Sequence, residues 1–391
     1  MSTPTLPLRD SYEGILQRAR IAANRGDLQN AIKLYRHLVE RLARLSDRVL
    51  ARRPELHNFQ VQARAELGQV LEMEGRYAEA IEVLEALPEL APDQSDDWRR
   101  DLAILRVAKG EVEQGLAELQ ALANDAPDQV WNWLALGNEA RIEGRFRESE
   151  AALDRALDVA KEHDPAELDS VHYYRFLLSR DMKSLDEAVD AWQSAATLNP
   201  DWNSEIRSVY TMLTDAGRYG QALSFVEEDE NELQAGLQRG VIDSLTGNPA
   251  KAEQEWQAVA QLDPFAFDYG HDCWAEAVLR IGDLDLALEK LQRLSARYGT
   301  PRLLVLSGIA WAMRGDPRLA SALFQQAINL LRRSRPPKKK LDKADWDLLD
   351  SLVDDNRIKA KLKTLFAVIE TPWGSAATKA RQEPPSSILR P

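Results

Sequence analysis

The sequence of 391 residues contains one cysteine, Cys273. A disulfide within the chain and a cluster of thiolates around a metal ion are therefore excluded. No run of about 18 apolar residues occurs, as a membrane-spanning helix would need, and residues 1–16 contain no apolar stretch of signal-peptide length. We expect a cytoplasmic protein with no membrane segment.

The motifs of common enzymes are also missing. There is no glycine-rich phosphate loop, no HExxH helix and no GxSxG elbow. His271, Asp272 and Cys273 come nearest to a metal or nucleophile cluster, but consecutive residues of a helix point about 100° apart and cannot converge on one atom. We predict no catalytic residue, no metal site and no cofactor. An accessory subunit of an enzyme stays open as a functional class.

Positive charge is scarce over most of the chain. The net charge is −13, yet residues 332–391 contain 14 Lys and Arg against 8 Asp and Glu, so the remainder carries −19. Nucleic acid is not an expected partner of such a body, because binding to phosphates depends on Lys and Arg. Residues 332–343 are the exception. They are either a solvated linker or a segment that contacts nucleic acid or another anionic surface.

What recurs in the sequence is a turn signal led by glycine. It occurs at Gly26, Gly75, Gly110, Gly144, Gly217, Gly247, Gly282 and Gly315, mostly 30 to 35 residues apart. The gap after Gly144 is about twice as long, and Lys183 lies near its middle. Glycine suits a helix that ends in the left-handed conformation, because other side chains clash there. We therefore predict nine helix-turn-helix units.

Each turn is followed by the same pair of positions. A small residue comes five positions after the turn residue: Ala31, Ala80, Gly115, Ser149, Ala188, Ala222, Ala252, Ala287 and Ala320. A bulky residue comes four positions later: Tyr35, Leu84, Leu119, Leu153, Trp192, Val226, Trp256, Leu291 and Phe324. Residues four apart share one face of a helix, so this pair predicts the buried face of each second helix.

The period and the residue order resemble those of the tetratricopeptide repeat family. The units that match best contain Leu67, Gly68, Tyr77, Ala80 and Pro92, and Trp133, Leu136, Gly137, Phe146 and Ala156. The resemblance implies an all-α fold, a right-handed α-solenoid of about nine units. Pro249 and Pro317 depart from the pattern, because they replace the aromatic residue after the turn.

The predicted organisation has five parts. They are an N-terminal tail at 1–11, a repeat array at 12–334, a basic linker at 335–343, a helical cap at 344–370 and a disordered tail at 371–391. Within the array, residues 32–50 suggest an overlong second helix. Trp192, Trp256, Trp274 and Trp311 are predicted to be core residues, and the acidic run 227–230 to be solvated.

The resemblance also implies a function, which is to bind another protein. In the family, first helices line a concave groove that accepts a peptide or a helix of a partner. The outward positions of the first helices here are Gln69, Glu72, Arg100, Asn138, Arg141, Tyr173, Arg180, Arg207 and Thr211. The recurrent arginines favour an acidic peptide segment. The alternative is that they are ordinary surface residues paired with neighbouring acids. The sequence gives no indication of oligomeric state.

Overall fold

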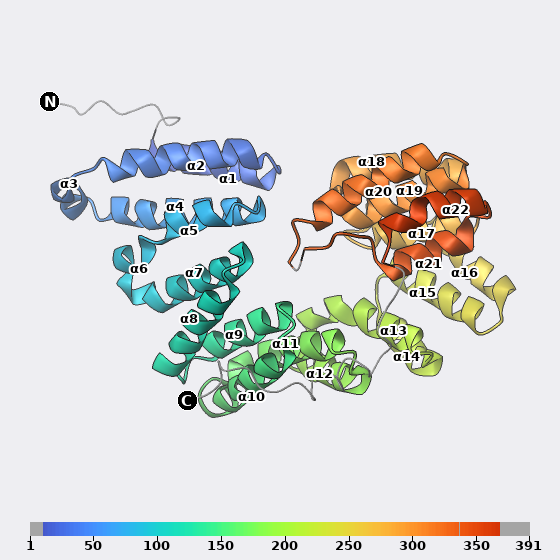
Figure 1. The fold of residues 1–391 in the computed structure, drawn as a ribbon, viewed down its shortest axis with the longest axis horizontal. Coiled ribbons are helices and arrows are strands. Elements are labelled where there is room, and N and C mark those ends of the chain that lie inside the picture. Colours follow the sequence, from blue (N-terminus) through green and yellow to red (C-terminus); the bar gives the residue numbers. More distant parts are fainter. Residues whose placement is uncertain (1–10, 336, 368–391) are drawn as a thin grey trace. The chain divides into compact units, whose positions relative to one another are not determined.

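The structure, a computed structural model, describes residues 11–335 and 337–367. Over these residues the fold is all-α, a solenoid of consecutive antiparallel helix pairs, as predicted (Figure 1). Contacts between residues divide the chain into two compact units, which meet in the sequence at Pro165 and Ala166. Each unit has hydrophobic core clusters of its own.

The first unit contains four of the pairs found in the described residues. Its helices are α1 (Tyr12–Asn24), α2 (Leu28–Ala43), α3 (Asp47–Arg52), α4 (Glu55–Met73), α5 (Tyr77–Leu84), α6 (Leu87–Leu90), α7 (Ser95–Lys109), α8 (Val112–Asp125), α9 (Val130–Ile142) and α10 (Phe146–His163). The short helices α3 and α6 stand outside the pairing.

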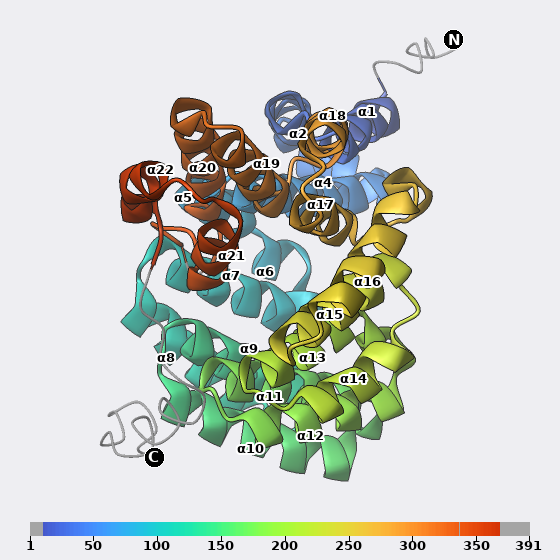
Figure 2. The same ribbon diagram turned by 90° about the vertical axis from the view of Figure 1, so that its right-hand side faces the viewer.

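The second unit contains five pairs and two further helices, again counted over the described residues. Its helices are α11 (Leu168–Asp181), α12 (Leu185–Leu198), α13 (Ile206–Asp215), α14 (Tyr219–Glu228), α15 (Glu232–Leu245), α16 (Pro249–Gln261), α17 (His271–Arg280), α18 (Leu284–Tyr298), α19 (Pro301–Met313), α20 (Pro317–Leu331), α21 (Lys343–Leu352) and α22 (Asn356–Leu362). Successive first helices, from α13 to α19, contact one another (Figure 2).

Backbone angles confirm the turns. All eight predicted glycines have positive φ, from 70° at Gly75 to 101° at Gly110. Lys183 also has positive φ, at 61°, and is the one described residue other than glycine that does. The ninth turn is therefore present and uses the left-handed conformation without a glycine, at a steric cost of about 1–2 kcal/mol.

The paired small and bulky positions are buried in all nine units. The small residues pack where two helices approach closely, and each bulky one is at most 9% exposed. Four first helices carry a glycine against the bulky residue. A Cβ atom added to Gly68 would come within 2.6 Å of Leu84, and one added to Gly240 would collide with Trp256. The recurring small and bulky residues of the sequence are therefore the residues at which the two helices of each pair pack together.

One prediction about a segment was wrong, and two others failed at one residue each. Residues 32–50 do not form one overlong helix, since α2 ends at Ala43 and α3 begins at Asp47 after an extended Ser46. Trp311 is only half-buried, whereas Trp192, Trp256 and Trp274 are buried as expected. In the acidic run, Glu227, Glu228 and Glu230 are exposed as predicted. Asp229 is buried, because its carboxylate accepts hydrogen bonds from the Tyr210 hydroxyl and the Asn231 backbone N–H.

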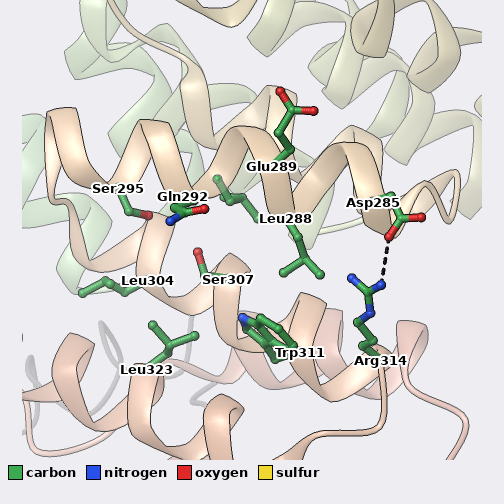
Figure 3. Close-up of a pocket in the computed structure, with 11 residues that line it drawn as sticks. Asp285, Leu288, Glu289, Gln292, Ser295, Leu304, Ser307, Trp311, Arg314 and Leu323 are labelled. Atoms are coloured by element: carbon green, nitrogen blue, oxygen red, sulfur yellow. Dashed lines mark ion pairs between the residues drawn. The ribbon is translucent and has the colours of Figure 1, made fainter.

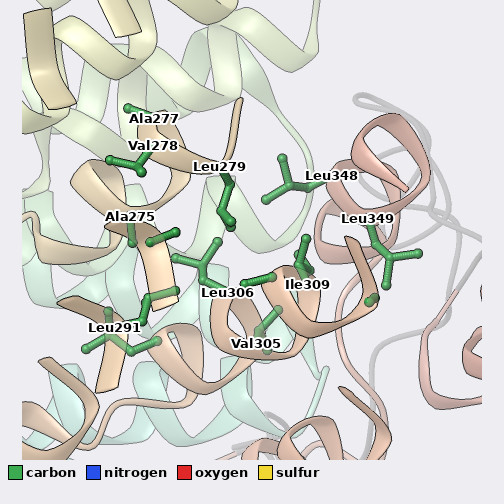
Figure 4. Close-up of a cluster of buried hydrophobic side chains, with 14 of the residues drawn as sticks. Ala275, Ala277, Val278, Leu279, Leu291, Val305, Leu306, Ile309, Leu348 and Leu349 are labelled. Atoms are coloured by element: carbon green, nitrogen blue, oxygen red, sulfur yellow. The ribbon is translucent and has the colours of Figure 1, made fainter. Parts of the chain in front are cut away.

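The helical cap is formed by α21 and α22, which contact α19 and α20. Leu348 and Leu349 of α21 pack against the core around Leu306 and Ile309 of α19 (Figure 4). Phe366 lies 5.1 Å from Phe324 between ring centroids. The cap therefore covers the apolar end of the second unit, as solenoids require.

The predicted tails lie outside the described residues, apart from Ser11, which caps α1. The bounds of the array, linker and cap remain a prediction. No helix in the described ranges has the length and the apolar character needed to cross a membrane.

Candidate functional site

A pocket of about 440 Å³ opens on the first helices of the second unit. We call it the first-helix pocket. Its lining comes from α13, α15, α17, α19 and α21: Arg207, Tyr210, Thr211, Thr214, Asp215, Gln234, Leu237, Gln238, Val241, Ser244, Leu245, Cys273, Glu276, Arg280, Arg302, Ala344, Asp347, Leu348 and Ser351. Most of these side chains are polar or charged, in contrast to the core behind them.

One wall of the pocket is a single face of α15. Gln234, Gln238, Val241 and Leu245 follow one another at intervals of three or four residues, which places them in one row along the helix. The Gln238 amide donates to Thr214 Oγ1 at 2.7 Å, and that hydroxyl donates to the Tyr210 carbonyl at 2.8 Å. Amides and hydroxyls therefore line the pocket in positions held by hydrogen bonds.

Arg207, which lines the pocket, forms an ion pair that links α13 to α17. Arg207 Nη2 lies 2.7 Å from Asp272 Oδ2, with 34% and 20% of the two side chains exposed. Burial raises the pKa of Asp272, but the Arg207 guanidinium outweighs it and leaves this pKa below its usual value. Both groups are therefore charged at neutral pH and hold the two helices together.

A second set of charges connects α17 and α19 to the cap. Arg302 Nη2 lies 2.7 Å from Glu276 Oε2, and Arg280 Nη2 lies 2.7 Å from Glu276 Oε1. Arg302 also pairs with Asp345 of α21. Burial raises the pKa of Glu276, but the two guanidiniums lower it further, below its usual value. For Asp345 burial prevails, and its pKa is raised.

The structure brings two of the predicted partner-binding residues, Arg207 and Thr211, into this pocket. Elsewhere in the second unit, Tyr173 stacks on Trp202, with ring centroids 3.9 Å apart. Arg180 lies 3.5 Å from Asp181. Much of the Tyr173 ring is thus already covered by another side chain.

The other predicted residues lie on first helices of the first unit. Gln69 is exposed and Glu72 half-buried on α4. Arg100 on α7 pairs with Asp97 at 2.6 Å and donates to Asn132 at 3.2 Å. Arg141 on α9 donates to Asn138 at 2.9 Å. Of these contacts, the pair between Arg100 and Asp97 is the kind of local contact with an acid that the alternative expects.

The run His271, Asp272 and Cys273 does not converge. The His271 ring contacts the Phe267 carbonyl at 3.1 Å and stacks on Tyr298, Asp272 pairs with Arg207, and Cys273 is 1% exposed. No three His, Cys, Asp or Glu side chains of the described ranges come together as a metal site would need. In the basic segment, Lys338 pairs with Asp342 at 2.8 Å.

Sequence reasoning missed most of the pocket. Gln234 and Gln238 stand four residues apart on a first helix, a spacing that could have been noticed. The lining residues Glu276, Arg302 and Asp347 could not, because they come from three helices and are separated by up to 71 positions. Helix packing, which the repeat pattern does not specify at this level, brings them together.

A comparison with protein families finds that the tetratricopeptide repeat model matches residues 16–95. Those residues span α1 to α6, and the same turn and the same buried positions recur in every later pair. Residues 16–95 thus match the tetratricopeptide repeat family, and the later pairs are built on the same pattern. Tetratricopeptide repeats generally serve as scaffolds for protein–protein interactions and are usually not catalytic.

A comparison with curated proteins gives no match. Among solved structures, this chain is similar to a tetratricopeptide repeat protein from Parabacteroides merdae, at 14% identity and a TM-score of 0.40, covering 69% of this chain and 98% of that one. A human IFIT1 dimer with m7Gppp-AAAA has 14% identity and a TM-score of 0.42, covering 84% and 73%. The APC/C hetero-tetramer Cut9–Hcn1 has 12% identity and a TM-score of 0.37, covering 88% and 76%.

Proposed function

We propose that this protein is a scaffold that binds a segment of a partner protein in the first-helix pocket. The observation that supports the proposal is the convergence of four first helices and the cap helix on one pocket lined by amides, hydroxyls and charges. Side chains of this kind can hydrogen-bond the backbone of an extended segment or the polar face of a helix. The cytoplasmic location predicted from the sequence remains part of this proposal.

The pocket offers two kinds of contact. Val241 and Leu245 are incompletely buried, and Leu245 is 56% exposed, so an apolar side chain of the partner can cover them. Thr211 and Ser244 are exposed beside them and can form hydrogen bonds. Apolar anchors surrounded by polar groups are the usual composition of a protein interface.

Site-specific photo-crosslinking tests the proposal. A photoreactive amino acid is placed at Thr211 or Ser244 in the pocket and, as controls, at Gln221 of α14 or Gln257 of α16, which lie on second helices. We expect one partner to be crosslinked from the pocket positions alone, always through the same segment, and a peptide of that segment to compete. Equal crosslinking from the control positions would contradict the proposal.

A finer form of the proposal is that the segment is acidic. It rests on the four predicted arginines, of which Arg207 lines the pocket and keeps about a third of its side chain exposed. Once the segment is known, its Glu and Asp residues are replaced by Gln and Asn. We expect at least a tenfold loss of affinity, and a weaker dependence of binding on salt. Unchanged affinity would refute the acidic preference and leave the scaffold proposal intact.

A further inference from the structure

A second pocket, of about 570 Å³, lies between α18, α19 and α20 (Figure 3). It shares no lining residue with the first-helix pocket, and we call it the α18–α20 pocket. Its lining consists of Asp285, Leu288, Glu289, Leu291, Gln292, Ser295, Leu304, Ser307, Trp311, Arg314 and Leu323. Its volume falls in the range of about 300–1,000 Å³ that is typical of small-molecule sites.

The preceding helix pair shows why this pocket exists. Ser307 stands eight residues before the turn glycine Gly315, and Trp274 stands eight residues before Gly282. Trp274 is 1% exposed, and its indole N–H donates to the Ala260 carbonyl at 3.4 Å. Ala260 and Ser295 are equivalent in the same way. Where one interface is filled by an indole against an alanine, the next has two serines.

Trp311 does not fill the volume that Ser307 leaves open. It lies one helical turn after Ser307, at the position of Val278, which is fully buried in the preceding pair. Trp311 itself is half-buried, and its ring forms a wall of the pocket (Figure 3). Leu288, Leu304 and Leu323 around it are also half-buried. Apolar surface is therefore left open inside the pocket rather than packed.

The pocket also contains an unsatisfied polar group. Ser295 Oγ is buried and has no hydrogen-bond partner. Buried hydroxyls are normally paired, and leaving one unpaired costs about 1–3 kcal/mol. The hydroxyl of Ser307 already donates to the Leu303 carbonyl at 2.8 Å. Ser295 is thus the group that a ligand could satisfy.

Charge is confined to the mouth of the pocket. Asp285 and Arg314 form an ion pair there at 3.1 Å, with 87% and 49% of their side chains exposed, and Glu289 is exposed as well. The lining farther in is leucine, tryptophan and serine. A charged ligand would lose hydration in this interior without gaining an opposite charge.

We propose that the α18–α20 pocket binds a small, uncharged aromatic molecule whose buried part has the size of an indole. The ring replaces the side chain that Trp274 supplies in the preceding pair, with Trp311 beside it in an edge or offset stack. An N–H or O–H group of the molecule donates to Ser295 Oγ. The site is independent of the partner-binding function proposed above.

Indole itself is the probe that tests the proposal. Its binding to the full chain is detected by saturation-transfer NMR and quantified by titration. A fragment of this size should bind with a Kd of about 1 mM. Gln292→Trp places a ring across the mouth from an exposed position and should weaken binding more than tenfold. Gln257→Trp is the matched control, since Gln257 occupies the same repeat position on α16, and it should leave binding unchanged.

Two further variants examine the interior. Ser295→Ala should weaken indole about fivefold, as loss of one hydrogen bond implies. Ser307→Leu fills the space from α19 and should abolish binding even if Gln292→Trp alters α18. Circular dichroism and thermal unfolding establish that each variant is folded.

Several outcomes would overturn the proposal. They are no binding of indole to the wild-type chain, binding that survives both Gln292→Trp and Ser307→Leu, or indole-3-carboxylate binding as tightly as indole. Trp373 lies outside the described residues and could supply an indole from the same chain. If indole binds the Trp373→Ala variant but not the wild-type chain, the Trp373 side chain, rather than a free ligand, is the occupant of the pocket.

Discussion

Arg100 in the first unit and Arg207 in the second occupy the same position of the repeat, ten residues before the turn glycine. Arg100 pairs with Asp97 three residues away, a carboxylate that is 60% exposed. Arg207 pairs across two helices with Asp272, which holds that same repeat position two units later. Arg100 also donates to Asn132 of α9 at 3.2 Å, so the two sites differ in the charged partner, which is local and exposed for Arg100 but tertiary and largely buried for Arg207.

The largest expected effect concerns the charges around Arg207. Glu276→Ala leaves Arg280 and Arg302 close together without their shared carboxylate, and a broken buried ion pair costs about 3–5 kcal/mol. Urea unfolding followed by circular dichroism should show this loss. Glu79→Ala in the first unit is the control, because Glu79 pairs with Arg36 and Arg76 at an exposed site. Similar shifts for both variants would contradict the comparison.

The two arginines themselves give the next effect. We expect Arg207→Ala to lower the free energy of unfolding by about 2 kcal/mol, because Asp272 would remain largely buried without its partner. Arg100→Ala should cost about 1 kcal/mol or less, because its partner Asp97 is 60% exposed and keeps its hydration, although Arg100 itself is only 18% exposed. Equal losses from the two variants would show that burial of the carboxylate does not distinguish the two sites.

In the first unit, we also expect stability to depend on pH through one half-buried carboxyl group. In the first unit, burial raises the pKa of Asp101, next to Arg100, from 3.8 to about 6; Arg100 opposes the shift, whereas Glu72 and Asp97 add to it. The folded state thus holds a proton that the unfolded state releases. The associated stability is present below pH 3.8 and is lost as the pH rises through 6. Asp101→Asn should flatten the dependence of stability on pH over this range, measured by thermal unfolding at several pH values.

The smallest effect lies in the turns. Gly144 and Lys183 have φ of 72° and 61° at equivalent turns, one in each unit. Lys183→Gly should stabilise the protein by about 0.5 kcal/mol, since relief of the left-handed strain exceeds the added entropy of the unfolded chain. Gly144→Lys should destabilise it by about 1 kcal/mol. Thermal unfolding of both variants measures this, and shifts of the same sign would refute the explanation.

The repeat could be predicted from the sequence because its positions have local causes. A left-handed residue must end each first helix, and a small residue must face a neighbouring helix, so both requirements are visible within about ten residues of each turn. Lys183 shows the strength of this signal, since the surrounding residues identified its turn without the glycine. The break between α2 and α3 was missed because residues 32–50 have a helical pattern on both sides of it.

The candidate sites depend on causes that are not local. Arg207 pairs with Asp272, which is 65 residues away in the sequence. The sequence does not specify which helices face each other at that separation. Trp311 was predicted to be buried because it occupies a core position, but the neighbouring Ser307 leaves the space beside it open. Aligning the units by their turns reveals the exchange of Trp274 for Ser307, although the resulting pocket became visible only in the structure.

The burial of Cys273 has a practical consequence. Its thiol is 1% exposed on α17, and burial raises its pKa well above the ordinary value, with Asp272 adding to the effect. Because the reactive form is the thiolate, a thiol reagent should react only when α17 opens. No other cysteine competes for the reagent. The rate at which Cys273 of the unmodified protein becomes labelled therefore measures how often the second unit opens at α17.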